Sequence, residues 1–304
     1  MLEKQYKQKG NSTLSIRNKP INFSIQDSYL VLLNLSKTLY KDSLLSSLRE
    51  LIVNGLDAIK MLKSEEERKN SYVYISLSNL DSYKENKELN EREPLVLTIK
   101  DEGIGMSRQF LETDFVVKGK SNKLGDASTT GGFGLGFMSL FCLGSLTTIE
   151  SIHNGEYCKY SVQDTGKTFQ IVLLEYKEVD KSIKSGTTLT ITLKDKYYDS
   201  QSINIISSNI KNLFCTNEKV VCLTDNIKHT KVPKLYETDS YYIVTEKLSS
   251  VDVNGILYKE SIKGDYNRDK FFIVPKFVQN KDVSFSLSRE SFDVSFSSID
   301  KLDI

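Results

Sequence analysis

The strongest constraint in the sequence is one helix-forming segment that is apolar on almost every side. Its apolar residues recur every three or four positions, which is the spacing of an α-helix: Leu44, Leu45, Leu48, Leu51, Ile52, Leu56, Ile59 and Leu62. Asp42 or Ser43 can cap its start. We therefore predict a helix over residues 42–63, buried on most of its surface.

A line of oxygen-bearing side chains interrupts this apolar helix. Glu50, Asn54 and Asp57 stand at i, i+4 and i+7, so they share one helical face. The simplest interpretation is a solvated helix face. The alternative is a functional site, because a buried amide or carboxylate needs partners, and a hydrated metal ion with a phosphate would supply them.

The remaining sequence predicts a sheet covered by helices, followed by a β-rich segment. Strand composition recurs along the chain, with a second helix near residues 201–213, and the predicted strands cover residues 72–78, 94–100, 145–153, 157–163, 168–176 and 187–194. After Pro233 the segments become short and rich in β-formers. The prediction is an α+β fold with a domain over residues 1–229 and a smaller segment over 230–304.

Composition excludes several kinds of function. Lys and Arg number 41 against 40 Asp and Glu, so no net field attracts nucleic acid or an anionic membrane. The four cysteines form no C-x-x-C pair, and only two histidines are present. Without a membrane-length apolar run or a hydrophobic signal core, the expected location is cytoplasmic. Carboxylates, amides, Lys, Arg and the backbone must carry any chemistry.

Three glycine-containing motifs lie in or after predicted strands. DEGIGM (101–106) follows a strand, TTGGFGLGF (129–137) precedes a helix, and GTTLTITLK (186–194) opens a strand. By itself the first indicates a tight turn, and the third an amphipathic strand. Successive N–H groups at a helix N-terminus can bind phosphate. A dinucleotide fold is disfavoured because its glycines directly follow a strand, whereas the polar stretch DASTT precedes these glycines. A Walker A loop is disfavoured because it would need glycine at position 114, which is Asp.

Taken in order, these motifs resemble those of the Bergerat-fold (GHKL) ATPases. RELIVNGLDAI, LTIKDEGIGMS, KGKSNK, GGFGLGFMS and GTTLTITLK are most similar to the 90-kDa heat-shock chaperone branch over about residues 40–195. Residues 21–304, including NGILY and VSFSLSRESF, also resemble the amino-terminal part of the rapid-lysis A proteins of large phages. The resemblance implies a Bergerat sandwich followed by a transducer-like segment, with ATP and Mg²⁺ as cofactors.

The resemblance implies a role for each matching residue. Glu50 matches the general base and Asn54 the Mg²⁺ ligand. Asp101 matches the carboxylate that accepts from the adenine amine, assisted through water by Thr187. The other positions matching the nucleotide site are Gly105 and Met106 for the adenine-site floor, Phe137 beside the base, Gly132, Gly134 and Gly136 around the phosphates, and Lys120 and Ser121 in the lid.

The implied activity is Mg²⁺-dependent ATP binding and slow hydrolysis, with lid closure driving homodimerisation or engagement of a protein partner or client. ATP is favoured over GTP because guanine presents a carbonyl where adenine has its amine. The alternatives are a catalytically weak nucleotide-binding interaction module and a DNA-acting MutL- or MORC-like ATPase. A histidine kinase is disfavoured because both histidines follow the glycine loop.

The sequence departs from the chaperone pattern at two places and contains one further candidate residue, Arg289. Asp114 replaces an Asn typical of the chaperones, and the lid region is shorter. Arg289, in VSFSLSRESF, is in phase with the apolar face as its predicted strand ends. It is either a structural ion-pair partner or, as the similar S-R-E segment suggests, a sensor of the γ-phosphate, with Lys276 as the second choice for that contact.

Overall fold

The computed structural model describes residues 43–79, 93–115, 136–165, 169–197, 200–227, 231–246, 248, 250–259, 271–277, 283–285 and 292–294. Its larger sheet has the strand order β5-β4-β3-β6-β2-β1-β7. All neighbours in this sheet are antiparallel except β1 and β7. The strands are β1 (Val73–Ser78), β2 (Val96–Asp101), β3 (Gly144–His153), β4 (Glu156–Asp164), β5 (Phe169–Glu178), β6 (Gly186–Leu193) and β7 (Val220–Cys222).

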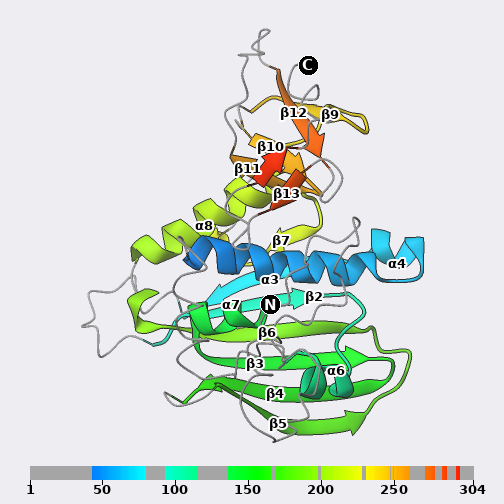
Figure 1. The fold of residues 1–304 in the computed structure, drawn as a ribbon, viewed down its shortest axis with the longest axis vertical. Helices are drawn as coiled ribbons and strands as arrows, with labels where there is room; N and C mark the ends of the chain where they lie inside the picture. Colours follow the sequence, from blue (N-terminus) through cyan, green and yellow to red (C-terminus); the bar gives the residue numbers. More distant parts are fainter. Residues whose placement is uncertain are drawn as a thin grey trace, which may run out of the picture.

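Helices cover one face of this sheet. The helices are α3 (Ser43–Lys60), α4 (Glu65–Lys69), α6 (Arg108–Thr113), α7 (Gly136–Leu143) and α8 (Ser200–Phe214), with 3₁₀ turns at Asp195–Tyr197 and Asp225–Ile227. Helix α3 packs on β1 and β2, and α7 and α8 pack beside it (Figure 1). The α+β fold is thereby confirmed, and α3 and α8 agree with the two predicted helices within a few residues.

The apolar pattern explains this arrangement. Strand β1 buries Val73, Ile75 and Leu77, every second residue, against α3, which buries Leu48 and Ile52 completely. Burial of each such side chain contributes about 1.5–3 kcal/mol, so the helix is held mainly by its contact with the sheet. Among the helices that the structure describes, none is both long and apolar enough to cross a membrane.

Helix α6 is fastened to strand β4 on the same face of the sheet. Ser107 caps it by accepting from the N–H of Phe110, at 3.1 Å. Glu112 Oε1 accepts from Tyr160 Oη of β4 at 2.8 Å and from Arg108 Nε at 2.9 Å. These two hydrogen bonds hold the pKa of the Glu112 carboxyl below its ordinary value. The end of the 101–107 loop is thus fixed by contacts from β4.

The segment after residue 230 is β-rich, as predicted. One sheet has the order β11-β10-β12-β9-β8, and β13 pairs with β14. These strands are β8 (Tyr236–Glu237), β9 (Tyr241–Val244), β10 (Ser250–Val253), β11 (Ile256–Lys259), β12 (Phe272–Phe277), β13 (Val283–Phe285) and β14 (Phe292–Val294). Figure 1 shows them at one end of the molecule, beside α3 and α8.

Apolar packing crosses the predicted boundary at residue 230. Val253, Ile256, Tyr258 and Phe277 belong to the same hydrophobic cluster as α3 and the larger sheet. A second cluster joins Cys215, which follows α8, to Val232, Tyr242, Val244, Leu257 and Val274. The boundary itself stays a prediction, and the β-rich segment packs directly on the helical layer.

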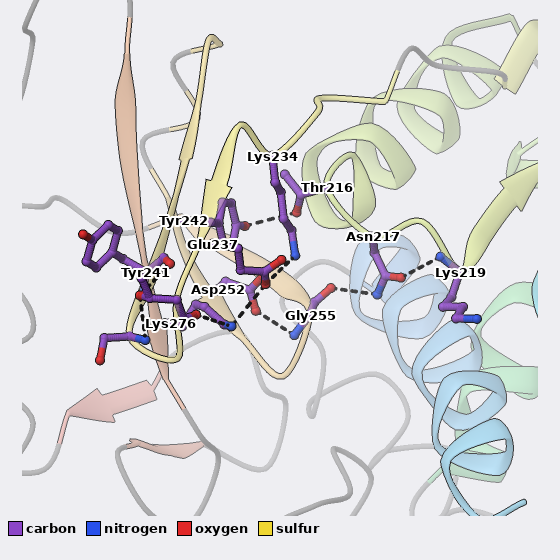
Figure 2. Close-up of polar contacts among 12 residues, drawn as sticks. Thr216, Asn217, Lys219, Lys234, Glu237, Tyr241, Tyr242, Asp252, Gly255 and Lys276 are labelled. Atoms are coloured by element: carbon purple, nitrogen blue, oxygen red, sulfur yellow. Dashed lines mark hydrogen bonds and ion pairs between the residues drawn. The ribbon is translucent and has the colours of Figure 1, made fainter. Parts of the chain in front are cut away.

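A buried polar network fastens this junction (Figure 2). Tyr242, fully buried, lies with its Oη 3.1 Å from Thr216 Oγ1 and also hydrogen bonds to Asp252. Asp252 Oδ1 accepts from the N–H of Gly255 at 2.6 Å in the β10–β11 turn. Asn217 Nδ2 donates to the Gly255 carbonyl at 2.9 Å. The chain after α8 is therefore bonded to β9 through Thr216 and to the β10–β11 turn through Asn217.

Asp252 makes the stability of this junction depend on pH. Burial raises the pKa of its carboxyl above the ordinary 3.8, against the opposing effects of the Gly255 N–H and Lys234. As the pH rises above 3.8, the unfolded chain loses this proton before the folded chain does, so the folded state is destabilised.

We predict that Asp252→Asn, which keeps an oxygen for Gly255, becomes progressively more stable relative to the wild type as the pH rises from about 4 to neutrality. Urea unfolding at a series of pH values measures the difference in free energy of unfolding. A difference that does not change with pH would contradict the assignment.

Candidate active site

Three half-buried residues of α3 form one line along the helix. Glu50, Asn54 and Ala58 are half-buried at i, i+4 and i+8, whereas most of the other residues from Leu44 to Ile59 are buried. Asp57 is fully buried, and its Oδ1 lies 3.2 Å from Lys60 Nζ. Of the three side chains predicted to share one face, Glu50 and Asn54 therefore line the accessible surface, and Asp57 lies in the interior.

Asp101 is brought against this helix by a glycine. It is the last residue of β2 and is buried. A Cβ on Gly55 would lie 3.1 Å from the Cβ of Asp101 and 3.1 Å from Val73 Cγ2. Because position 55 carries no side chain, α3 can approach the end of β2 closely, and Asp101 lies beside the turn between Asn54 and Ala58.

The loop after Asp101 folds back onto the same turn of α3. Asp101 Oδ1 accepts from the N–H of Gly103 at 2.9 Å, and the N–H of Ile104 donates to the Ala58 carbonyl at 3.2 Å. A Cβ on Gly103 would lie 2.5 Å from that of Ala58. The loop therefore continues the line formed by Glu50, Asn54 and Ala58.

Strand β3 supports the loop from the opposite side. Ser151 Oγ accepts from the N–H of Met106 at 2.7 Å and lies 3.4 Å from Thr187 Oγ1. His153 Nδ1 lies 2.8 Å from the Ile104 carbonyl, to which it donates. Ser151 and His153 were not predicted as site residues. The only available signal was that Ser151 is in phase with buried Ile149 on its strand.

Thr187 stands between Asp101 and Ser151 in the sheet. It pairs with Asp101 across β2–β6 and with Ser151 across β3–β6, and it is buried. This register gathers a carboxylate and two hydroxyl groups at one place, and the predicted water-assisted role of Thr187 beside Asp101 stays a prediction.

Several predicted site residues lie elsewhere or outside the described part of the chain. Lys120, Ser121, Gly132, Gly134 and Arg289 are outside the described residues, and their roles stay predictions. Gly136 and Phe137 form the first turn of α7, which packs against α3; the Phe137 side chain is not among those described.

Lys276 lies on β12 and makes contacts within the β-rich segment. Its Nζ is 3.1 Å from Glu237 Oε1 and donates to the Thr238 carbonyl at 2.8 Å. Figure 2 shows Lys276 and Glu237 near Asp252, so in this structure the ammonium group is occupied by contacts within its own sheet.

One cysteine contacts this arrangement: the Cys158 thiol donates to the carbonyls of Met106 at 3.9 Å and Ser151 at 3.8 Å. All four are free thiols, and Cys142, Cys158 and Cys215 are buried. Burial raises the pKa of the Cys158 and Cys222 thiols to about 11, which keeps both protonated and unreactive near neutral pH. That carboxylates, amides, Lys, Arg and the backbone carry the chemistry of the site stays a prediction.

Gly105 offers a test of the loop geometry. Its φ is +69°, and a Cβ there would overlap the Ile152 carbonyl oxygen. We predict that Gly105→Ala lowers the free energy of unfolding by roughly 1–3 kcal/mol and displaces the loop, with loss of nucleotide affinity.

Gly155→Ala is the matched control. Gly155 has a φ of +86°, and a Cβ there would meet the flexible Lys181 side chain at 2.8 Å, in the β3–β4 turn. This variant should be destabilised and keep nucleotide affinity. Chemical unfolding and nucleotide titration of both variants measure the two effects. Equal affinity in the two variants would separate Gly105 from the site.

Comparison with known proteins agrees with this geometry. Residues 43–190 match the family of histidine kinase-, DNA gyrase B- and HSP90-like ATPases. Chaperone protein HtpG of Ehrlichia ruminantium is 32% identical over 167 residues, covering 48% of this chain and 24% of the relative. HtpG of Polaromonas sp. is 32% identical over 168 residues, covering 50% and 25%.

Anaplasma marginale HtpG is 26% identical over 168 residues, covering 50% of this chain and 24% of the relative. The chain thus spans about a quarter of the length of these relatives. The resemblance to the phage rapid-lysis A proteins stays a prediction. The matched span contains α3, the Asp101 loop, Ser151 and Thr187, so residues 43–190 form a domain of the histidine kinase-, DNA gyrase B- and HSP90-like ATPase type.

Proposed function

We propose that this domain binds ATP with Mg²⁺ and hydrolyses it slowly. The observation that carries the proposal is the continuous line from Glu50 through Asn54 and Ala58 to the Asp101 loop. A carboxylate and an amide lie at one end of this line, and a buried carboxylate lies at the other. Such a line offers separate places for the phosphates and the base of one nucleotide.

At the base end, Asp101 would accept a hydrogen bond from the adenine amine. Two contacts hold Asp101 in place: the Gly103 N–H donates to Oδ1, and Thr187 pairs with Asp101 across the sheet. Gly105 and Met106 would form the floor of this end, with Met106 fixed by Ser151. A pure acceptor here favours adenine over guanine.

At the phosphate end, Glu50 would act as general base. It takes a proton from water as the water oxygen bonds to the γ-phosphorus, and the bond from that phosphorus to the bridging oxygen breaks to release ADP and inorganic phosphate. The Asn54 amide oxygen is half-exposed on the same line and is a ligand type that Mg²⁺ accepts. A bound Mg²⁺ would neutralise phosphate charge.

Larger-scale consequences rest on the same proposal. Gly132, Gly134 and Gly136 would surround the phosphates, Phe137 would flank the base, and Lys120 and Ser121 would close over the nucleotide. Lid closure would then drive homodimerisation or engagement of a protein partner, with Arg289 contacting the γ-phosphate. Because the relatives are named chaperones, a protein client is favoured over nucleic acid as the partner of this chain. ATP binding without turnover would instead support the interaction-module alternative.

The adenine assignment predicts that Asp101→Asn abolishes ATP and ADP binding. The new amide oxygen can still accept from Gly103, whereas its NH₂ presents donors toward the adenine amine. Isothermal titration calorimetry measures the affinities.

Glu102→Gln is the matched control for Asp101→Asn, because Glu102 accepts from Tyr72 N–H at 3.0 Å and pairs with Lys184 at 3.1 Å. Its affinity should equal that of the wild type. Unchanged binding by the Asp101 variant would refute the adenine assignment.

The general-base assignment predicts that Glu50→Gln keeps ATP affinity and lowers turnover by roughly two orders of magnitude or more, because the proton acceptor is lost. Phosphate release under saturating ATP measures the rate. Glu150→Gln serves as control: Glu150 alternates with buried Ile149 and Ser151 on β3 and contacts Tyr157 and Lys159. Full turnover by the Glu50 variant would mean that another group is the base.

A further inference from the structure

The β10–β11 hairpin holds the β-rich segment to the ATPase domain at two places. Its turn is bonded to the chain after α8 through Asn217 and the Gly255 carbonyl, at 2.9 Å. Its second strand carries Tyr258, which is buried in the main hydrophobic cluster. The guanidinium carbon of Arg49 lies 5.3 Å from the centre of the Tyr258 ring. The second contact therefore reaches α3 itself.

Arg49 immediately precedes Glu50. Arg49 is only 3% exposed, whereas Glu50 is half-buried on the accessible line. Successive residues of a helix point about 100° apart, so the two side chains leave the same turn in different directions. Because a helical turn is rigid, fixing the direction of Arg49 also fixes the direction in which Glu50 leaves the helix.

We propose that Tyr258, acting through Arg49, is a positioning residue for Glu50; this inference rests on the proposed ATPase function. A buried guanidinium needs compensation for lost hydration, and the face of an aromatic ring supplies part of it. Without the ring, Arg49 would turn toward other acceptors and rotate the Glu50 turn. The contact thus relates the placement of the β-rich sheet to the alignment of the general base.

The β10–β11 hairpin is itself paired with the rest of the β-rich sheet. Strand β10 pairs in parallel with β12 through Asp252 and Lys276, so the hairpin moves with the sheet that carries Lys276. A displacement of this sheet on partner binding or dimerisation would change the Tyr258–Arg49 contact. Turnover would then respond to the state of the β-rich segment, with no change in the nucleotide contacts of Asp101.

Two substitutions at Tyr258 in the full chain separate positioning from packing. Tyr258→Phe keeps the ring, and Tyr258→Leu fills similar space without one. We expect Phe to retain kcat within about twofold and Leu to lower it on the order of tenfold, with ADP affinity within about twofold of wild type in both. Calorimetry and phosphate release measure the two quantities. Wild-type kcat in the Leu variant, or equal losses in both, would overturn the proposal.

Hydrogen exchange supplies a second measurement that does not depend on turnover. Tyr258→Leu should increase exchange of the α3 amides around Glu50 and leave β1 and β2 unchanged, while Tyr258→Phe should not. Adding Arg49→Met to Tyr258→Leu should produce little further effect, since both remove one contact. ATP binding without turnover in the wild type would refute the proposed hydrolysis. Unchanged exchange of the α3 amides in Tyr258→Leu would by itself overturn the role of Tyr258.

Discussion

The close approach of α3 to the end of β2 is the contact on which the rest of the site depends. It requires the absence of a side chain at Gly55, where a Cβ would press on Asp101 and Val73. Glycine inside a helix costs about 1 kcal/mol relative to alanine, so its presence is a local disadvantage offset by packing. With a larger residue, the helix would move away from the sheet. Glu50 and Asn54 would then no longer share one surface with the Asp101 loop.

The site is rigid at one end because strands, and not the loop itself, determine its geometry. Ser151 and His153 fix Met106 and Ile104, and Ala58 fixes Ile104 from the other side. A loop held by hydrogen bonds from both layers loses little further entropy when a ligand binds. Rigidity at the base end leaves conformational change to other parts of the domain, which is compatible with the proposal that nucleotide binding closes a lid.

The sequence was informative where a residue's role follows from its own segment. Helical period alone placed Glu50 and Asn54 on one face, and the strand-end position of Asp101 followed from PLVLTIK and the glycines after it. It could not separate Asp57 from that face, because the difference between half-buried and buried depends on what packs there. Ser151 and Tyr258 were missed for a related reason: their partners are 45 and 209 positions away, so only the sheet register and the packing of the hairpin bring them together.

Helix α3 carries two buried charges, Arg49 and Asp57, and one of them helps to fix the orientation of the helix. An entirely apolar helix could roll in its groove with little penalty, because dispersion contacts are not directional. Asp57 pairs with Lys60 of the same helix, so this pair turns with α3. Arg49 lies over Tyr258 of β11, so that ring compensates its charge in only one orientation of the helix. Apolar residues of similar size would stabilise the fold as well or better. We infer that the Arg49–Tyr258 contact instead specifies the roll of α3, which is the property that the proposed general base on this helix would require.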